Sequence, residues 1–529
     1  MDALQGIGTR ATPQRFAADS RQVRNNAGGF TFEVTPLVRL RRFLTLGTEG
    51  GTFYVRAQAL TRENAEVVLD FARHRTAELV AEIVAVSTAG RAPKQNPALF
   101  ALAAAASLGD VEGRRTALAA LPLVARTGTH LFLFAGYVEQ FRGWGRGLRR
   151  AVGDWYLRTP VDDLAYQAVK YRQREGWTHR DLLRLAHPGT VEPDRKRLFD
   201  WICGREVAHD GLRMVEGYER AQRAPLARIP ELVREYRLSW EMLPDAAVDS
   251  PAVWEALLDN GLPQTALLRQ LPRLTRLGLL GPGSARTGAV TAQLGDRTRL
   301  RKARVHPVSV LLALRTYASG RSVRGDGTWT PSGPIVDALD AAFYAAFEAV
   351  DPTGKRHLLA LDVSGSMTVR ISGLPLSARE ASAALALVTA STEDSPHLLG
   401  FTGGSGWGAA VSPLAISPRQ RLDDVLRTIE HLPFGGTDCA LPMLYALEKG
   451  LEVDVFSVYT DSETWAGSVH PHQALARYRR EVNPEAKLVV VGMTSTGFSI
   501  ADPSDAGMLD VAGFDAAVPG VIADFARGE

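Results

Sequence analysis

The first two-thirds of the chain shows the hydrophobic spacing of consecutive amphipathic helices. Apolar residues share one helical face over residues 79–84, after a candidate N-cap at Thr76, and again over residues 339–350. Short breakers containing glycine or proline separate such stretches, and strand patterns are nearly absent before His357. Stacked helix pairs bury their apolar faces against their neighbours without needing one large core. We therefore predict an all-α array of HEAT-like repeats over residues 1–355.

From His357 onwards, apolar runs typical of buried strands alternate with helical patterns. The predicted strands are residues 357–362, 397–401, 454–460 and 486–491, and the predicted helices are residues 378–392, 423–431 and 472–480. Strands separated by helices of this length form a parallel sheet covered on both faces, with ligands beyond the carboxyl ends of the strands. The chain is thus predicted to be multidomain, with a doubly wound, Rossmann-like α/β domain over residues 356–529.

Length and composition agree with a folded protein of more than one domain. The chain has 529 residues, of which 45% are hydrophobic and 22% charged, and a single core stops growing at roughly 250 to 300 residues. The only two cysteines, Cys203 and Cys439, lie far apart, which argues against a disulfide framework or a cysteine zinc site. No signal peptide and no apolar stretch of membrane-spanning length is evident. We expect a cytoplasmic protein without a membrane partner.

The formal net charge of +3 hides an uneven distribution. Residues 357–529 contain 11 Lys and Arg against 21 Asp and Glu, a charge of −10, which leaves +13 for residues 1–356. A basic region of this size is typical of a protein that binds a polyanion, since neutralising phosphates releases their counterions. A solvated basic surface without a ligand is the alternative.

Oxygen-bearing side chains follow the predicted strands of the α/β domain. The motif D-x-S-x-S supplies Asp362, Ser364 and Ser366 directly after the first strand, a glycine-rich loop supplies Thr437, and Asp461 ends the third strand. Few carboxylates and several hydroxyls, with room for water, suit octahedral Mg²⁺ better than zinc. The sequence therefore predicts a site for Mg²⁺ or another divalent cation at these five residues.

The sequence gives less support to a catalytic function for these residues. Ser364 stands where an aspartyl phosphatase would need a second acid, and no G-x-S-x-G motif surrounds Ser364 or Ser366. Serine and aspartate after a strand also serve as helix caps. We expect no enzymatic activity; a metal-dependent nuclease and a protein-binding scaffold that uses the metal site remain the alternatives.

Longer motifs resemble one known family. The metal-site elements resemble the metal-ion-dependent adhesion site of von Willebrand factor A domains, and the runs LDVSGSM, GGTDCALPM and GMTSTGFSIADP resemble the corresponding domain of the Ro autoantigen, or TROVE, family of RNA-binding proteins. In the N-terminal part, the runs that resemble this family are LGTEGGTFY, WGRGLRRAV, KYRQREGWTHRDLLRLAH and ARVHP. The match fades between residues 192 and 249, and the glycine-rich run over residues 401–411 has no counterpart that we recognise.

The resemblance implies a function. It implies a bacterial member of the family, folded as a monomeric ring of HEAT-like repeats that the von Willebrand factor A domain closes. Small noncoding Y RNA would bind outside the ring, and single-stranded ends of misfolded RNAs or ribosomal RNA precursors would enter its central hole. In bacterial members, Y RNA is thought to tether the ring to the exoribonuclease polynucleotide phosphorylase, so the protein would be a non-catalytic adaptor in RNA quality control, processing and degradation.

Basic residues in one segment are candidates for the Y RNA interface. The resemblance ties Lys170, Arg174 and His187 to Y RNA binding. Lys170 and Arg174 are four residues apart, so on a helix both would reach neighbouring phosphates, and Arg180 and Arg184 repeat that spacing. His187 precedes a proline, which places it at a predicted helix end, where an imidazole can contact a phosphate or a base. Basic pairs at this spacing also occur on solvated helix faces that bind nothing.

A second basic cluster precedes this segment. Arg146, Arg149 and Arg150 lie close together in the sequence, between Trp144 and Trp155. We predict that the arginines contact RNA, whereas tryptophans in a helical array are more often part of the core than stacking platforms for bases.

Overall fold

The chain folds into two compact units. The computed structural model describes residues 11–33, 35–46, 65–88, 95–174, 176–281, 283–303, 305–322, 326–371, 375–403, 410–417, 419–432, 435–493, 498–512 and 518–528. One unit, here called the helical unit, comprises Arg56–Leu294 and Thr328–Val336; the other, the α/β unit, comprises Met1–Val55, Gly295–Gly327 and Asp337–Glu529. The predicted boundary between residues 355 and 356 stays a prediction.

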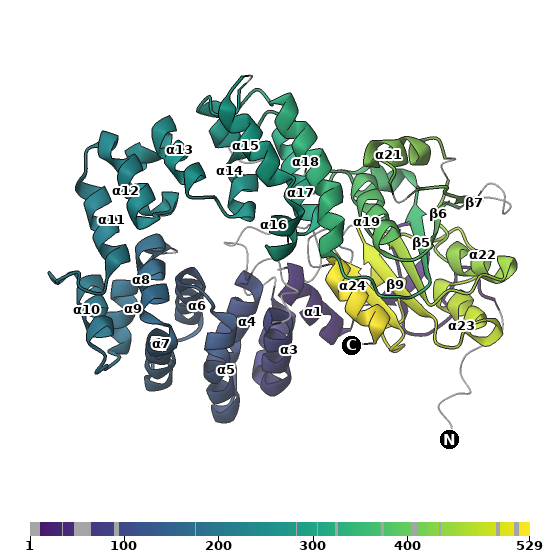
Figure 1. Cartoon of the computed structure of the whole chain (residues 1–529). Coiled ribbons are helices and arrows are strands. Elements are labelled where there is room, and N and C mark those ends of the chain that lie inside the picture. Colours follow the sequence, from purple (N-terminus) through teal and green to yellow (C-terminus); the bar gives the residue numbers. More distant parts are fainter. Residues whose placement is uncertain are drawn as a thin grey trace. The chain divides into compact units, whose positions relative to one another are not determined.

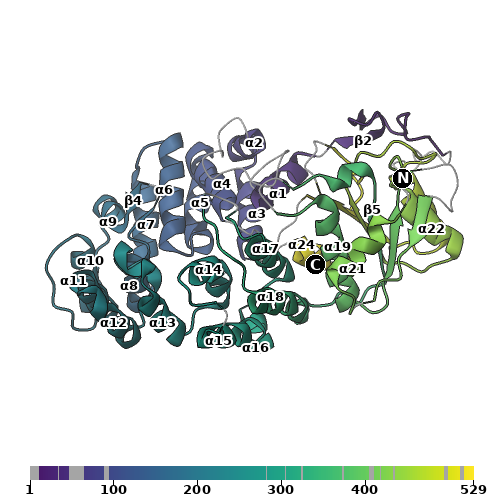
Figure 2. The same cartoon turned by 90° about the horizontal axis from the view of Figure 1, so that it is seen from above.

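The helical unit is a stack of short helices in two layers (Figures 1 and 2). Its first helices are α2 (Glu66–His74), α3 (Thr76–Thr88), α4 (Asn96–Leu108), α5 (Val111–Val124), α6 (Gly128–Phe141), α7 (Arg146–Arg158), α8 (Val161–Lys170) and α9 (His179–Ala186). Helices α2, α4 and α6 pack in one row, and α3, α5, α7 and α9 pack in the other. This arrangement confirms the predicted stacking of helical neighbours.

Small side chains explain how the centre of this stack closes. Every residue of α4 from Pro97 to Ala106 is buried, and most of them are alanines. Alanine has the highest intrinsic helix propensity and lets neighbouring helices approach closely on all sides. The predicted N-cap at Thr76 is wrong: α3 begins at Thr76 itself, whose hydroxyl donates to the Ala72 carbonyl oxygen at 2.9 Å because α2 ends only two residues earlier.

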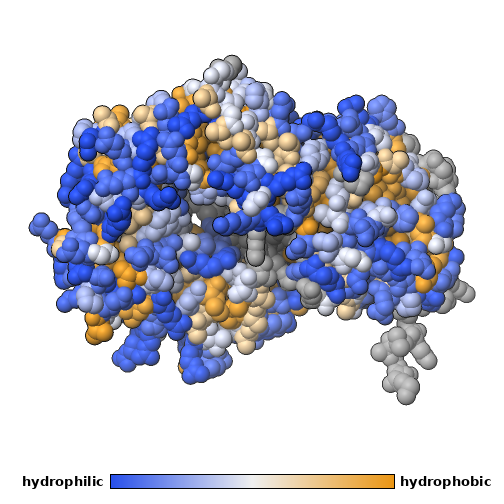
Figure 3. Space-filling view, in the orientation of Figure 1, coloured by the Kyte–Doolittle hydropathy of each residue, from blue (hydrophilic) through white to orange (hydrophobic). Residues whose placement is uncertain are grey.

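The stack continues with shorter helices. They are α10 (Pro193–Ile202), α11 (Arg213–Arg223), α12 (Ile229–Tyr236), α13 (Pro251–Asp259), α14 (Gln264–Arg276) and α15 (Ala285–Leu294). Between α8 and α9 the chain forms a two-stranded hairpin, β3 (Gln173–Arg174) and β4 (Trp177–Thr178). Hydrophilic residues cover most of the face of this unit seen in Figure 3, with apolar residues in separate patches.

The α/β unit is built on a six-stranded sheet. Its strands, in spatial order, are β11 (Met508–Ala512), β9 (Lys487–Gly492), β8 (Val455–Thr460), β5 (His357–Asp362), β6 (His397–Phe401) and β7 (Val411–Pro413). Neighbouring strands are parallel except β7, which runs antiparallel to β6. The four predicted strands are confirmed to within about one residue at each end, whereas β7 and β11 were not predicted.

Helices cover both faces of this sheet, as a doubly wound fold requires. They are α19 (Ala378–Thr392), α21 (Leu422–Glu430), α22 (Leu441–Lys449), α23 (Pro471–Glu481) and α24 (Val518–Arg527). Leu358 and Ala360 of β5 pack in one core with buried residues of α22 and α23. Helix α19 packs against β5, and the Tyr459 hydroxyl of β8 hydrogen-bonds to Thr389 of α19. Further helices of this unit are α1 (Pro36–Leu46), α16 (Arg297–Lys302), α17 (Pro307–Ala318) and, for most of its length, α18 (Gly333–Ala345).

The N-terminal segment is an integral part of the α/β unit. Strands β1 (Gln22–Arg24) and β2 (Phe30–Glu33) form a hairpin, and β2 pairs with β10 (Phe498–Ser499). Gln14 is fully buried, and its amide nitrogen donates to the Asp438 carboxylate at 2.7 Å while its amide oxygen accepts from the Thr464 hydroxyl at 2.6 Å. The polar sequence of this segment did not predict these contacts.

Some predicted features lie outside the described residues. They are most of the LGTEGGTFY run, residues 404–409 of the glycine-rich run and residues 494–497 of the run that ends in ADP. Among the residues that the structure does describe, no helix combines the length and apolar character needed to cross a bilayer.

Candidate functional site

Four of the five predicted metal ligands lie at the carboxyl ends of β5 and β8. Asp362 ends β5 and is 1% exposed; its carboxylate accepts from the Ser364 backbone amide at 2.9 Å and from the Thr460 hydroxyl at 2.7 Å. The Ser364 and Ser366 hydroxyl oxygens lie 3.0 Å apart. Ser364 is buried and Ser366 is exposed, so this end of the cluster is open to solvent.

Asp461 completes the acidic part of the cluster. It follows β8, the strand beside β5, and is buried. Burial, together with repulsion from the Asp461 charge, raises the pKa of Asp362 to about 6, although hydrogen bonds from Ser364 and Thr460 oppose the shift. Two buried carboxylates that repel each other are the arrangement that a divalent cation relieves.

Thr437 lies on the loop that runs beside these strand ends. Its carbonyl oxygen accepts from the backbone amides of Trp465 and Ala466 at 3.0 and 3.1 Å, which fixes the loop against the segment after β8. Two residues later, the Cys439 thiol lies 3.6 Å from the Thr460 hydroxyl, the same hydroxyl that donates to Asp362. Cys439 is fully buried and packs in the core of the α/β unit.

The donor chemistry of this cluster fits Mg²⁺. It offers two carboxylates and three hydroxyls, all hard oxygen donors. Among the described residues, no three His, Cys, Asp or Glu side chains come together as a metal-ligand group, so the hydroxyls and water would have to supply the rest of the coordination shell.

The predicted arginines of α7 are exposed and unpaired. Arg146, Arg149 and Arg150 lie on the first turns of the helix, and none of them forms an ion pair with a carboxylate in the described part of the chain. Trp155, on the same helix, is buried and its indole N–H donates to the Ala125 carbonyl oxygen at 2.6 Å. This confirms that Trp155 belongs to the core; Trp144 is half-buried, with its ring 5.5 Å from that of Trp177.

Lys170 and Arg174 do not share a helix, so the predicted common face is wrong. Helix α8 ends at Lys170, and Arg174 lies in β3. The chain turns there into a tight hairpin in which Gly176 adopts a φ of +80°, a backbone conformation that glycine tolerates without strain. Arg174 is exposed. The Lys170 ammonium is half-buried and lies 3.6 Å from the Glu241 carboxylate and 3.2 Å from the Tyr166 hydroxyl.

The other predicted residues of this segment lie on and after α9. Arg180 and Arg184 are one turn apart on the helix and exposed, as predicted. The helix starts with a capping box formed by Thr178 and Asp181. It ends at His187, which is exposed and adopts a left-handed backbone conformation with φ of 47°. The prediction that His187 lies at a helix end is confirmed.

We call the predicted basic residues that are exposed on these neighbouring elements the α7–α9 surface. Helices α7 and α9 pack against each other, and the β3–β4 hairpin leads directly into α9. The members of the surface are Arg146, Arg149, Arg150, Arg174, Arg180, Arg184 and His187. Exposed guanidinium groups without acidic partners are free to contact phosphates.

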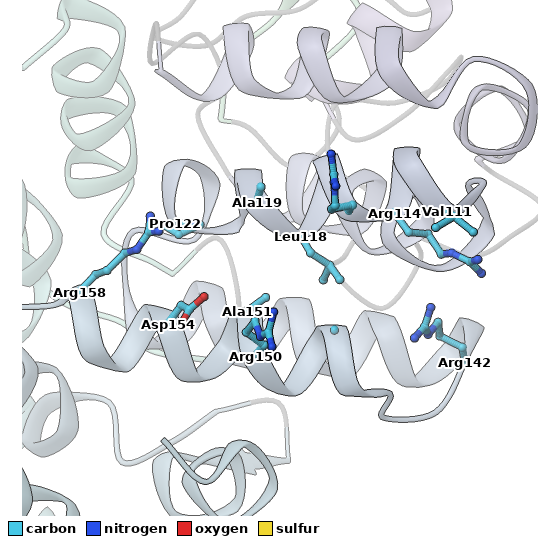
Figure 4. Close-up of a pocket in the computed structure, with 12 residues that line it drawn as sticks. Val111, Arg114, Leu118, Ala119, Pro122, Arg142, Arg150, Ala151, Asp154 and Arg158 are labelled. Carbon is cyan, nitrogen blue, oxygen red and sulfur yellow. The ribbon is translucent and has the colours of Figure 1, made fainter. Parts of the chain in front are cut away.

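A groove next to this surface was not predicted. It lies between α5 and α7, and five of its lining residues are arginines (Figure 4). Arg142 follows the end of α6 and Arg150 lies on α7, so their four-residue spacings from Arg146 do not place them on one helical face. Arg114, Arg115 and Arg158 join them only because α5 packs against α7.

Comparisons with known proteins agree with both parts of the chain. Residues 356–526 match the model of the Ro60 vWA domain, and residues 23–220 and 235–316 match that of the TROVE domain. The chain is 44% identical to RNA-binding protein RO60 of Deinococcus radiodurans, with 99% of each chain covered. The chain belongs to the Ro60 family. Residues 221–234, which the TROVE match leaves out, lie within the segment where the sequence resemblance fades.

More distant and structural relatives support the same conclusion. The chain is 34% identical to RNA-binding protein RO60 of Caenorhabditis elegans, covering 96% of this chain and 90% of that protein. The crystal structure of the Deinococcus radiodurans RO (RSR) protein superposes with a TM-score of 0.79 at 43% identity, covering 94% of this chain and all of that one. Both Ro60 family relatives are named as RNA-binding proteins and not as enzymes.

Proposed function

We propose that this Ro60 family member is a non-enzymatic RNA-binding protein that holds small structured noncoding RNA, of the Y RNA type, on the α7–α9 surface. The observation that carries the proposal is the set of exposed arginines on that surface, none of which is neutralised by a described carboxylate. The names of the relatives support RNA as the ligand.

Unpaired arginines favour RNA for two physical reasons. Each phosphate that an arginine neutralises releases condensed counterions, which favours binding without base recognition. An arginine that is already ion-paired must first lose its partner, whereas these arginines contact the ligand without that cost. Structured RNA presents its phosphates and 2′-hydroxyls in a regular shape, so a fixed array of guanidinium groups on packed helices recognises that shape.

The wider role proposed here follows from the family resemblance. Single-stranded ends of misfolded RNAs or of ribosomal RNA precursors would enter a central hole of the helical ring. The bound Y RNA would tether polynucleotide phosphorylase, which makes the protein an adaptor and leaves the chemistry of degradation to the exoribonuclease.

We also propose that Asp362, Ser364, Ser366, Thr437 and Asp461 hold Mg²⁺ or another divalent cation. The hard oxygen donors and the repulsion between two buried carboxylates support the assignment. When bound, the ion would act as a Lewis acid with a position for an external oxygen ligand. Hydrogen bonds from the Thr460 hydroxyl and the Ser364 amide hold the Asp362 carboxylate in a fixed orientation, which supports the proposal.

Thermal unfolding tests the metal assignment. Mg²⁺ in excess should raise the Tm of the wild-type protein, because a ligand that binds only the folded state stabilises it. The variants D362N and D461N should lose that rise, and D505N, which alters an aspartate outside the cluster, should keep it. An equal rise in Tm for the wild type and D362N would contradict the assignment.

Co-purification tests the RNA proposal. The protein should be isolated from its own cells without ribonuclease, and the nucleic acid that accompanies it should be quantified by absorbance and sequenced. We expect a stoichiometric small structured RNA, and we expect its loss from the triple variant K170A/R174A/H187A. A preparation free of nucleic acid that also binds no added RNA would overturn the proposal.

A protein-binding scaffold is the second candidate. The observation that favours it is the solvent-open end of the metal cluster at Ser366, where an acidic side chain of a partner could reach a bound cation. A partner that remains bound after ribonuclease treatment and is lost in D362N would favour this function. RNA that stays intact after long incubation with the protein and Mg²⁺ would dismiss a nuclease.

A further inference from the structure

The groove between α5 and α7 has the size of a ligand site. Its volume is about 540 Å³, within the range of roughly 300 to 1,000 Å³ that is common for ligand pockets. Both walls are regular helices that pack against each other, so the groove is a fixed feature of the helical unit. Figure 4 shows the labelled side chains of the two helices on both sides of this groove.

The charge of this groove is strongly positive. The arginines that line it are Arg114, Arg115, Arg142, Arg150 and Arg158, against the single carboxylate of Asp154. Arg115 pairs with Glu112, and Arg142 donates to the Ala106 carbonyl oxygen. Arg114, Arg150 and Arg158 have no acidic partner among the described residues, and the Asp154 carboxylate pairs with no described cation.

The arginines are spread along the groove rather than gathered at one point. Arg158 lies at one end, Arg114 and Arg142 lie at the other, and Arg150 lies between them (Figure 4). Eight residues separate Arg150 from Arg158 on α7, which corresponds to about 12 Å along the helix axis. One phosphate cannot contact both guanidinium groups across this distance. A ligand that pairs with both therefore carries several phosphates.

Between the arginines, the lining is apolar. Leu118, Pro122 and Ala151 contribute to it, and Asp154 lies among them. Nucleobases pack on such apolar surfaces and on guanidinium planes. The Asp154 carboxylate repels phosphates and the carboxylates of an acidic peptide alike, but it can accept a hydrogen bond from the exocyclic amino group of a base. The mixture therefore favours RNA over an acidic protein segment.

Geometry also decides between single-stranded and duplex RNA. The bases of a duplex are paired and stacked inside it, so only an unpaired base can lie against the apolar lining between the arginines. We infer that the α5–α7 groove binds an unpaired stretch of a few nucleotides, with phosphates on the arginines at both ends and a base beside Asp154. This inference rests on the proposed function; Arg150, which belongs to both sites, joins the groove to the α7–α9 surface.

Two RNA probes and a matched set of variants test the inference in the full-length protein. The probes are an oligocytidine of about ten nucleotides, a length within the usual range for single-strand sites, and a small stable RNA hairpin. The double variant R114Q/R158Q alters only the groove, and A119E places a carboxylate on its exposed wall. The control R126Q alters an exposed arginine that does not line the groove.

We expect the wild type to bind both probes. The affinity of R114Q/R158Q for oligocytidine should fall about tenfold or more, and the slope of log K against log salt should decrease in magnitude by about 1.4, for two phosphate contacts of about 0.7 each. Binding of the hairpin should stay within about twofold, and R126Q should behave as the wild type. Oligouridine, whose bases lack an amino group, should bind less tightly than oligocytidine, and D154A should remove that difference.

The outcomes separate this inference from the proposed function. Wild-type protein that binds neither probe would contradict the proposed function itself. If both groove variants bind the hairpin normally and keep the oligocytidine affinity of the wild type, the groove does not bind single-stranded RNA and only this inference is overturned. Binding of polyglutamate by the wild type, lost in the two groove variants alone, would overturn it as well. If the variants fail to fold, ultraviolet crosslinking of oligocytidine to the wild type decides the matter: crosslinks in α5 and α7 support the inference, and crosslinks confined to other elements overturn it.

Discussion

Arginines are about equally dense in two consecutive stretches of the helical unit, residues 142–184 and residues 192–237, but among the described residues only those of the second stretch form ion pairs with acids. Seven of the nine arginines in residues 192–237 form ion pairs, for example Arg195 with Glu192 and Arg234 with Asp259. Of the nine in residues 142–184, none pairs with a carboxylate that the structure describes.

This difference shows that the count of basic residues does not locate a binding surface. An ion-paired arginine contributes little net field, because its partner cancels most of its charge beyond a Debye length. Residues 1–356 carry a net charge of +13. An approaching polyanion is therefore attracted most strongly to the elements whose arginines form no ion pair with a described carboxylate.

The largest expected effect comes from neutralising the unpaired stretch. The triple variant R146Q/R149Q/R150Q should lose about 30- to 100-fold in affinity for a small structured RNA, and its salt slope should fall in magnitude by about two to three. A filter-binding salt titration measures both quantities.

The matched control alters three arginines of the paired stretch. R220Q/R223Q/R228Q removes the same formal charge from residues with glutamate partners. Its affinity should stay within about threefold of the wild type. Equal losses in the two triple variants would break the comparison, because net charge alone would then govern binding.

A smaller loss is expected on α9. The double variant R180Q/R184Q removes two exposed guanidinium groups one turn apart, and we expect the affinity for structured RNA to fall about tenfold. Gel-shift titration at constant salt checks this. Unchanged affinity would confine the interface to α7 and the hairpin.

Lys170 allows a paired and an unpaired basic residue to be compared within the same segment. Its ammonium already interacts with Glu241, so K170Q should reduce RNA affinity less than R174Q, which removes an exposed charge that pairs with no described carboxylate. Conversely, E241Q frees the ammonium and should raise the affinity by about two- to threefold. A loss of affinity in E241Q, measured in the same titration, would show that the ion pair itself organises the interface.

The last prediction concerns the stability of the fold beneath the surface and not the affinity for RNA. Burial lowers the pKa of His179, which hydrogen-bonds to the Tyr156 hydroxyl at 2.8 Å, to about 4. Because the unfolded histidine titrates near 6.5, the unfolded state takes up a proton first as the pH falls. The free energy of unfolding should therefore drop by roughly 1 to 2 kcal/mol between pH 7 and pH 5 from this residue.

Urea denaturation at the two pH values checks this linkage. H179Q, which cannot take up the proton, should show a smaller difference between pH 7 and pH 5 than the wild type. The same difference in both proteins would assign the acid sensitivity to other groups.

Local patterns predicted the sheet core and most of the metal cluster. The strands from His357 and His397 have the predicted bounds because each is a short apolar run with clear ends. Asp362, Ser364 and Ser366 are close in sequence, so their contacts follow from the local turn. Strand β10 pairs with β2 across more than 460 residues, and no local pattern indicates such a partner.

The sequence predicted which basic residues form the α7–α9 surface, but it did not predict how the fold arranges them. Spacing alone placed Lys170 and Arg174 on one helix, whereas the turn at Gly176 ends that pattern and directs Arg174 into a hairpin. The pairing state of an arginine depends on which carboxylates the fold brings near it. Glu241, for example, reaches Lys170 from 71 residues away. The α5–α7 groove likewise exists only through packing of two helices, so its ligand could not be inferred from the sequence.

The most direct test of the account is a map of the contacts of bound RNA. The protein, loaded with the small structured RNA that co-purifies with it, should be crosslinked by ultraviolet light, and the crosslinked peptides should be identified by mass spectrometry. We predict crosslinks in α7, in the β3–β4 hairpin and in α9, with few or none in α10 to α12. Crosslinks concentrated in residues 192–237 would contradict the claim that unpaired arginines define the RNA surface.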